Sequence, residues 1–218
     1  HQVWLPVWQP EAGWQWHSLP RDAVGEKGLP HSQGLDELTS FLLWLDPAMA
    51  AASQPALSGT PAQVGWVRLQ AMHTVGLQAI SQGAVQRAWE QAQAQALLRR
   101  QGGVSIIEHA AVRLLLGTAQ DALQESAQVL QQVSSACCAW PDLFNRWRAR
   151  ARCQTSLSAG ASAALQVFGG MGYMRDNGME KHLRDVSHLR QLGGSPAELR
   201  LCVAETDRLL AHDRVPAP

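Results

Sequence analysis

The sequence predicts a mainly α protein, an antiparallel helical bundle preceded by a small β segment. Short alternating hydrophobic runs, broken by proline and glycine, fill the first 60 residues and are typical of strands and loops. Beyond them the composition changes to alanine, glutamine and leucine, and apolar residues recur at intervals of three and four, as on one face of a helix. We therefore expect two domains, a partial β segment at residues 1–60 and a helical bundle at residues 61–218.

The β segment is predicted to hold three short strands, within residues 3–8, 13–17 and 41–45. A sheet of this size, with prolines in it, cannot cover its own faces and edges. We expect it to pack on another part of the molecule.

Three long helices are predicted to follow, each of nearly thirty residues or more and joined by short loops, as in a bundle. The first ends near Arg100, where Gly102 and Gly103 stop it. Its predicted buried face is Leu69, Met72, Gly76, Ile80, Ala84, Ala88 and Ala92. The second helix would bury Ile107, Ala111, Leu114, Leu115, Ala122, Leu130 and Val133. The third would bury Phe144, Trp147, Ala151, Leu157, Ala161, Leu165 and Phe168.

The last helix has a clear start. Ser195 is a good N-cap, Pro196 suits the first helical position, and Glu198 completes a capping box. Its predicted buried stripe is Leu199, Cys202, Val203, Thr206 and Leu210.

Composition excludes several classes of protein. Basic and acidic residues number 18 each, so no overall field attracts nucleic acid, and we expect no such partner. The arginines at 146, 148, 150 and 152 are interpreted as a solvated helix face, since a spacing of two spreads them around the helix. No histidine or cysteine spacing is typical of a metal site, so none is predicted.

Four cysteines without paired spacing predict reduced thiols and a cytoplasmic protein. We expect no membrane span, since no apolar run is long enough. Because the chain begins at His1, inside a predicted strand, we also expect it to be a fragment of a longer protein.

Five segments carry a family resemblance. Residues 166–173 read QVFGGMGY, 180–185 read EKHLRD and 193–195 read GGS, while upstream 83–92 read GAVQRAWEQA and 99–103 read RRQGG. Together, in the order in which they stand along the chain, they resemble the C-terminal helical domain of the acyl-CoA dehydrogenase family. The strand region resembles the end of that family's β-domain, whereas its N-terminal helical domain has no counterpart here.

The resemblance implies FAD as cofactor. In the family the GG turn contacts the adenosine diphosphate part of an FAD bound by a neighbouring subunit. Carried over by motif, the implied cofactor-binding residues are Arg99, Gln101, Gln166, Gly169, Gly170, Gly194 and Ser195. From the residues alone, the GG turn could equally be a helix C-cap.

The residue that most members use as catalytic base, the glutamate of an E-G-T turn, corresponds here to Gly193. Other members carry the glutamate ten residues before the glycine that corresponds to Gly83, and that position holds His73. An imidazole is a chemically possible base. His73 is therefore the candidate catalytic residue, and its alternative interpretation is a structural histidine with one hydrogen bond.

We expect an FAD-dependent acyl-CoA dehydrogenase-like oxidoreductase acting on the CH–CH group of an acyl-CoA thioester. The alternatives are a non-catalytic structural subunit of a heteromeric acyl-CoA dehydrogenase and a flavin monooxygenase of the same fold. Expected partners are an acyl-CoA substrate and either further copies of the chain, in a dimer or tetramer, or a subunit that supplies the missing domains.

Overall fold

The structure is a computed structural model that describes residues 2–30, 33–45, 48, 53–133 and 139–212. The chain divides into two compact units. The first comprises His1–Met72 with Ala136–Leu143, and the second comprises His73–Ser135 with Phe144–Pro218. The boundary expected at residue 60 follows the change from strand to helix and stays a prediction.

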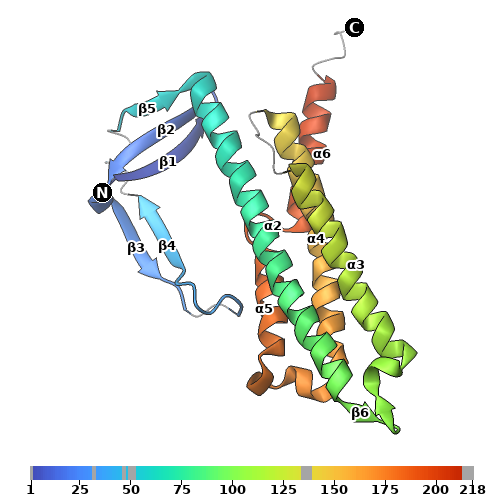
Figure 1. The fold of residues 1–218 in the computed structure, drawn as a ribbon. Helices are drawn as coiled ribbons and strands as arrows, with labels where there is room; N and C mark the ends of the chain where they lie inside the picture. Colours follow the sequence, from blue (N-terminus) through green and yellow to red (C-terminus); the bar gives the residue numbers. More distant parts are fainter. Residues whose placement is uncertain (1, 31–32, 46–47, 49–52, 134–138, 213–218) are drawn as a thin grey trace. The chain divides into compact units, whose positions relative to one another are not determined.

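The first unit is built on strands. β1 (Gln2–Gln9), β2 (Gly13–Pro20) and β5 (Pro55–Ser58) form an antiparallel sheet in the order β1-β2-β5. β3 (Val24–Gly28) and β4 (Phe41–Leu45) form a separate antiparallel pair. The three predicted strands are confirmed as β1, β2 and β4 (Figure 1).

Two tryptophans of β2 pack on the start of the long helix α2 (Gly59–Leu98). Trp16 Nε1 donates to the carbonyl oxygen of Ala62 at 2.9 Å, and Trp14 stacks on Trp66 with ring centroids 4.7 Å apart. Residues at the start of α2, which belong to the same unit, therefore pack against one face of the sheet.

The second unit is an antiparallel helical bundle (Figure 1). The end of α2 packs beside α3 (Ala110–Val133) and α4 (Trp140–Val167), followed by the shorter α5 (Met179–Leu189) and α6 (Pro196–His212). This architecture confirms the predicted fold class.

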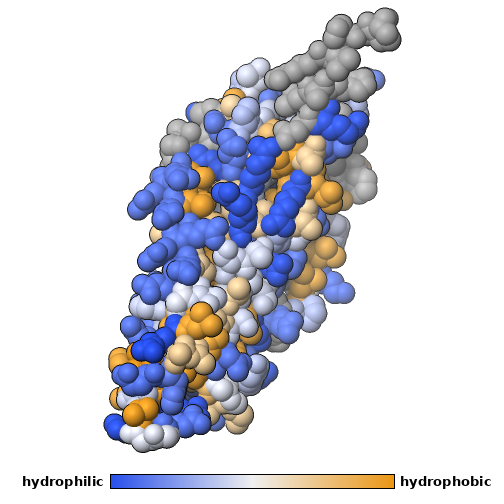
Figure 2. Space-filling model, turned by 90° about the vertical axis from the view of Figure 1, so that its right-hand side faces the viewer, coloured by the Kyte–Doolittle hydropathy of each residue, from blue (hydrophilic) through white to orange (hydrophobic). Residues whose placement is uncertain are grey.

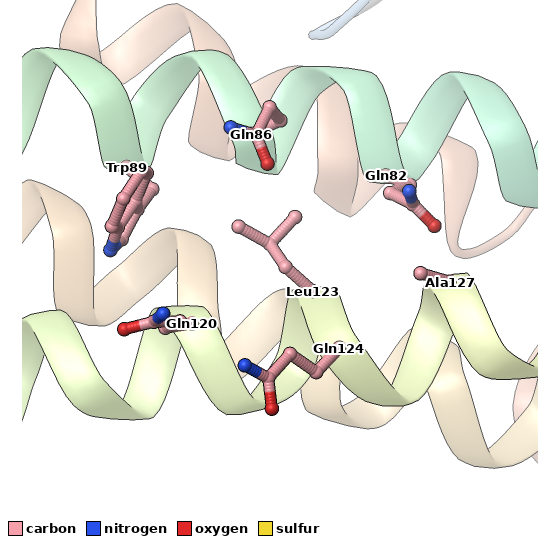
Figure 3. A pocket seen from close by; sticks show the side chains of 7 residues that line it. All are labelled: Gln82, Gln86, Trp89, Gln120, Leu123, Gln124 and Ala127. Atoms are coloured by element: carbon pink, nitrogen blue, oxygen red, sulfur yellow. The ribbon is translucent and has the colours of Figure 1, made fainter.

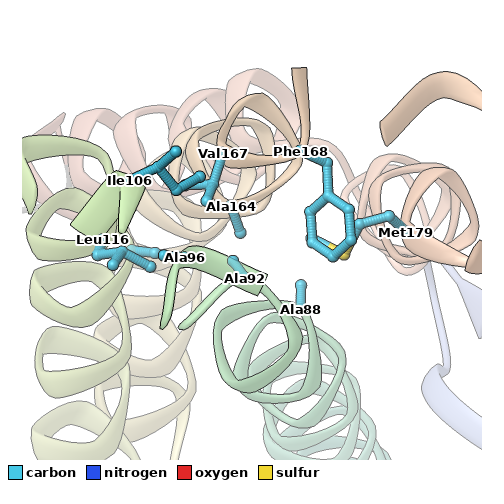
Figure 4. Close-up of a cluster of buried hydrophobic side chains, with 10 residues drawn as sticks. Ala88, Ala92, Ala96, Ile106, Leu116, Ala164, Val167, Phe168 and Met179 are labelled. Atoms are coloured by element: carbon cyan, nitrogen blue, oxygen red, sulfur yellow. The ribbon is translucent and has the colours of Figure 1, made fainter. Parts of the chain in front are cut away.

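Small residues let these helices approach closely. A Cβ on Gly160 of α4 would lie 3.1 Å from Ala122 Cβ of α3 and 3.4 Å from Val85 Cγ1 of α2. At one end of the bundle Phe168 and Met179 point toward one another (Figure 4). The buried cluster there comprises Ala88, Ala92, Ala96, Ile106, Leu116, Ala119, Ala164, Val167, Phe168 and Met179.

The predicted buried face of α2 is correct at Ala88 and Ala92 and wrong at its beginning. Leu69, Met72 and Ile80 are 44%, 75% and 55% exposed. Each step of four residues turns a helix about 40° beyond a full turn, so five steps from Met72 to Ala92 rotate the stripe by about 200°. A stripe written at that interval cannot stay on one face of so long a helix.

The buried face predicted for α4 agrees with the structure better than the one predicted for α3. On α4 the stripe from Phe144 to Phe168 is confirmed, with Trp147 half-buried. On α3 it is wrong at Ala111, which is exposed, and at Leu114, which is 72% exposed. The residues that α3 buries are Leu116, Ala119, Ala122, Leu123, Ser126 and Val129.

The predicted end of the first long helix and the predicted start of the last helix are confirmed, whereas α3, with 24 residues, is shorter than predicted. α2 ends at Leu98, and β6 (Arg100–Gln101) pairs with β7 (Val104–Ser105) in a hairpin. Its two turn residues, Gly102 and Gly103, have φ of +63° and +85°, which glycine adopts most readily. On α6, Leu199 and Val203 are buried as predicted, Cys202 is exposed contrary to prediction, and the side chain of residue 210 lies outside the described part.

Candidate functional site

The turn between α5 and α6 carries the position of the missing glutamate. Gly193 and Gly194 have φ of +65° and +102°, a left-handed backbone that strains any residue with a Cβ. The capping box that starts α6 follows directly. The backbone N–H of Ser195 donates to Glu198 Oε2 at 2.7 Å, and the Glu198 N–H donates to Ser195 Oγ at 3.3 Å.

His73 of α2 lies against this turn. A Cβ placed on Gly193 would lie 2.8 Å from His73 Cε1, 3.1 Å from its Nδ1 and 3.1 Å from Leu77 Cδ1. The imidazole therefore occupies the space where a side chain at position 193 would begin. The sequence marked His73 and Gly193 separately, 120 positions apart, and the fold brings them together.

Arg150 of α4 holds the turn from inside the bundle. Its side chain is 1% exposed. Nη1 donates to the carbonyl oxygens of Gly193 and Gly194 at 3.1 and 3.4 Å, and Nη2 donates to those of Leu189 at 3.0 Å and Leu192. One guanidinium thus satisfies carbonyl groups at the end of α5 and in the turn after it.

The interpretation of the arginine cluster as a solvated face is wrong for two of its members. Arg146 and Arg150 are buried, whereas Arg148 and Arg152 are exposed. Residues 146 and 150 lie one turn apart on the side of α4 that faces the bundle. Their spacing of four beside the apolar stripe is a signal of burial, although arginine is rarely buried.

Partial burial and a nearby positive charge favour the neutral form of His73. Partial burial lowers the pKa of its imidazole, and the positive charge of Arg150 lowers it further. A neutral imidazole has an unprotonated nitrogen that can accept a hydrogen bond or a proton. The arrangement therefore supplies a proton acceptor where a carboxylate is missing.

Beneath His73, α2, α3 and α4 share a buried polar cluster that sequence reasoning missed. Gln78 Nε2 donates to Ser126 Oγ at 2.7 Å, and Gln154 Nε2 donates to Ser81 Oγ at 2.9 Å. All four residues are at most 1% exposed. Such a network fixes the register of three helices against one another, because a shift would leave buried polar groups unpaired.

The implied cofactor residues fall into two groups. Arg99 Nη1 donates to the carbonyl oxygen of Phe168 at 3.1 Å and lies beside the turn η3 (Gly169–Tyr173), where Gly169 has φ of +61°. The second group, Gly194 and Ser195, lies beside His73. The rise along α2 from His73 to Arg99 is about 39 Å. The two groups therefore lie far apart along α2 and cannot line one small site.

The first group fits a surface contact with a nucleotide. Arg99, Gln101, Gln166 and Gly170 are exposed, and their side chains and backbone offer hydrogen-bond donors. A Cβ on Gly170 would have no heavy atom within 4 Å, so the backbone there is open to close approach.

A hollow of about 250 Å³ lies between α2 and α3. Figure 3 shows Leu123 pointing from α3 toward α2, with Trp89 at one end and Gln82 at the other. The remaining lining residues are Gln86, Gln120, Gln124 and Ala127. Its described lining offers amides and apolar surface but no titratable group.

Among the described residues, no group of three or more His, Cys, Asp or Glu is placed to hold a metal ion. The described helices likewise include none with enough length and hydropathy to cross a bilayer. The two cysteines in the described part, Cys153 and Cys202, are free thiols, while Cys137 and Cys138 lie outside it.

One family model matches most of the helical part of the chain. Residues 71–206 match the family model described as acyl-CoA dehydrogenase, C-terminal domain. The 3-sulfinopropanoyl-CoA desulfinases of Cupriavidus necator and Variovorax paradoxus are each 28% identical over 130 residues. The alignments cover 60% of this chain and 33% of those proteins, so the match spans about a third of the relatives' length.

Solved structures share the fold at low identity. A prolyl acyl carrier protein oxidase is 17% identical with a TM-score of 0.76, covering 94% of this chain and 56% of that one. The glutaryl-CoA dehydrogenase of Mycobacterium smegmatis is 15% identical with a TM-score of 0.76, covering 94% of this chain and 53% of that one.

Proposed function

The chain belongs to the acyl-CoA dehydrogenase family, and from this premise we propose that it is an FAD-dependent oxidoreductase acting on the CH–CH group of an acyl-CoA thioester. The observation that carries the proposal is the place of His73. Its ring lies within 2.8 Å of the point where a side chain on Gly193 would begin.

His73 acts as the base in this proposal. An unprotonated ring nitrogen accepts the α-proton of the thioester, and the carbon–hydrogen electron pair moves toward the Cα–Cβ bond. The lowered pKa of His73 favours the neutral form that this step needs. Arg150 holds the turn against which the imidazole rests, so it positions the base without touching the substrate.

FAD, when bound, supplies the acceptor for the hydride that leaves the β-carbon. Within this chain, Gly194 and Ser195 would hold FAD beside the reacting centre. The residues at the opposite end of α2 would hold the adenosine diphosphate part of an FAD bound by another copy in a homo-oligomer. Those residues are Arg99, Gln101, Gln166, Gly169 and Gly170.

The test begins with the colour of the purified protein and with anaerobic titration by acyl-CoA. We expect flavin absorbance that bleaches in wild type, and that bleaches at least about a hundredfold more slowly in His73→Ala, the usual contribution of a general base. His188→Ala, on α5, is the matched control and should bleach at the wild-type rate. Unchanged bleaching in His73→Ala would remove that residue as the base.

Other outcomes would favour the alternatives. A colourless protein that FAD fails to stabilise against heat, and that co-purifies with a longer chain carrying an E-G-T turn, would indicate a structural subunit. A flavoprotein that acyl-CoA does not bleach, but that consumes oxygen with an external reductant, would indicate a monooxygenase.

The relatives favour a second candidate. They are named for removing a sulfinate group from 3-sulfinopropanoyl-CoA, and this chain would act on the same class of 3-sulfinoacyl thioester. Release of sulfite from that substrate, without net bleaching of the flavin, would support desulfination over dehydrogenation.

A further inference from the structure

A hollow of about 650 Å³ opens between α3, α4 and α6. The residues that line it are Gln132 and Val133 of α3, Asn145, Arg148, Ala149 and Arg152 of α4, and Arg200 of α6. Figure 2 shows this side of the bundle, where long, strongly hydrophilic side chains lie side by side in the upper half. That half holds the end of α3 and the beginning of α4.

Three guanidinium groups from two helices converge on this hollow. Arg148 and Arg152 are one turn apart on α4, and like charges at that spacing weaken a helix by about 0.2–0.5 kcal/mol. Arg200 reaches across from α6 and donates from Nη2 to the carbonyl oxygen of Ala151 at 3.2 Å. That bond holds the third guanidinium over the same stretch of α4.

The lining of this hollow is basic, whereas the whole chain is balanced, with 18 basic and 18 acidic residues. None of the described residues that line the hollow is acidic. Glu125 of α3 influences the nearby Cys153, as does Arg152, but Glu125 is not part of the lining. Arg148 also has an interaction of its own, and Arg152 and Arg200 complete the basic lining.

We propose that this hollow, called here the arginine pocket, binds a phosphate monoester of a small molecule. Guanidinium groups match the geometry of phosphate oxygens and bond to them in pairs, and Asn145 and Gln132 add neutral donors. Two sources share this chemistry, the 3′-phosphate of coenzyme A and a free nucleotide. The proposal does not depend on flavin or on His73, since neither His73 nor Gly193 lines the arginine pocket.

Calorimetric titration of the purified chain at low salt tests the proposal, with adenosine 3′,5′-bisphosphate as the probe and adenosine as the neutral control. We expect binding of the bisphosphate only, and a dissociation constant raised about tenfold in both Arg152→Gln and Arg200→Gln. Arg113→Gln, an exposed arginine on α3 outside the pocket, is the matched control and should leave the constant unchanged. Affinity should fall as salt rises.

Equal binding of adenosine and the bisphosphate, or equal affinity in all three variants, would overturn the proposal. Coenzyme A and 3′-dephospho-coenzyme A then separate the two sources. A tenfold preference for coenzyme A that is lost in Arg152→Gln would assign the pocket to its 3′-phosphate. Equal affinity for the two, while the bisphosphate still requires Arg152, would assign it to a free nucleotide.

Discussion

Arg150 offers the sharpest test of how the candidate site is built. Replacing it with methionine keeps the apolar stem and removes a guanidinium that donates to four carbonyl groups. At the low end of the range for charged hydrogen bonds, ~1.5 kcal/mol each, these bonds are worth about 6 kcal/mol. Burying the charge offsets roughly half of that, so we expect Arg150→Met to lower the free energy of unfolding by about 3 kcal/mol.

Urea denaturation followed by helical circular dichroism measures this loss. Arg150→Lys keeps the charge but cannot reach all four carbonyl groups with one ammonium group, so it should lie between wild type and methionine. Arg113→Met, at an exposed position, should change stability by no more than about 0.5 kcal/mol. A methionine variant as stable as wild type would refute the role given to Arg150.

A second readout separates the charge of Arg150 from its packing. Because that charge lowers the pKa of His73, its removal should raise the pKa, although burial will still keep it below the ordinary value. Arg150→Lys should leave the pKa close to that of wild type. NMR titration of the His73 ring protons measures the shift, and an unchanged pKa in Arg150→Met would show that the two groups do not interact.

Three further predictions test the surrounding structure. Gly172→Ala should lower the free energy of unfolding by about 1–3 kcal/mol in urea denaturation, because its Cβ would lie 2.6 Å from a backbone carbonyl oxygen. Gly170→Ala has open space and should lower it by less than about 0.5 kcal/mol. Equal losses in the two variants would contradict the packing of the GG turn. Ser195→Ala should cost about 1 kcal/mol by removing the cap of α6, measured in the same way, and no loss would contradict the capping box. Cys202 should react with iodoacetamide at pH 8 while Cys153 stays unlabelled in peptide mapping, because burial raises the pKa of Cys153 to about 11; rapid labelling of Cys153 would show that the bundle core opens.

Much of the fold follows from local sequence. The capping box at Ser195 and Glu198 marks the start of α6 because its hydrogen bonds join residues three positions apart. Gly102 and Gly103 end α2 because two left-handed residues in a row suit a hairpin turn and not a helix. The order and spacing of the motifs from residue 83 to residue 195 indicate the family, since both can be read from the sequence without knowing which helices pack together.

Tertiary structure alone decided which face the beginning of α2 buries and what the site contains. The apolar residues at the start of α2 are exposed because burial depends on where neighbouring helices lie, and a regular interval does not encode that position. Arg150 is inside the bundle because four carbonyl groups at the end of α5 and in the next turn need donors, and those groups are about 40 residues away in sequence.

The sequence by itself determined the family, the order of helices and the loss of a carboxylate at Gly193. It also offered His73 as a substitute, with an ordinary structural histidine as the alternative. Only the fold placed that imidazole against Gly193. The contact joins a residue within α2 to a turn 120 residues further along the chain, and such a contact is set by helix packing and not by any local pattern.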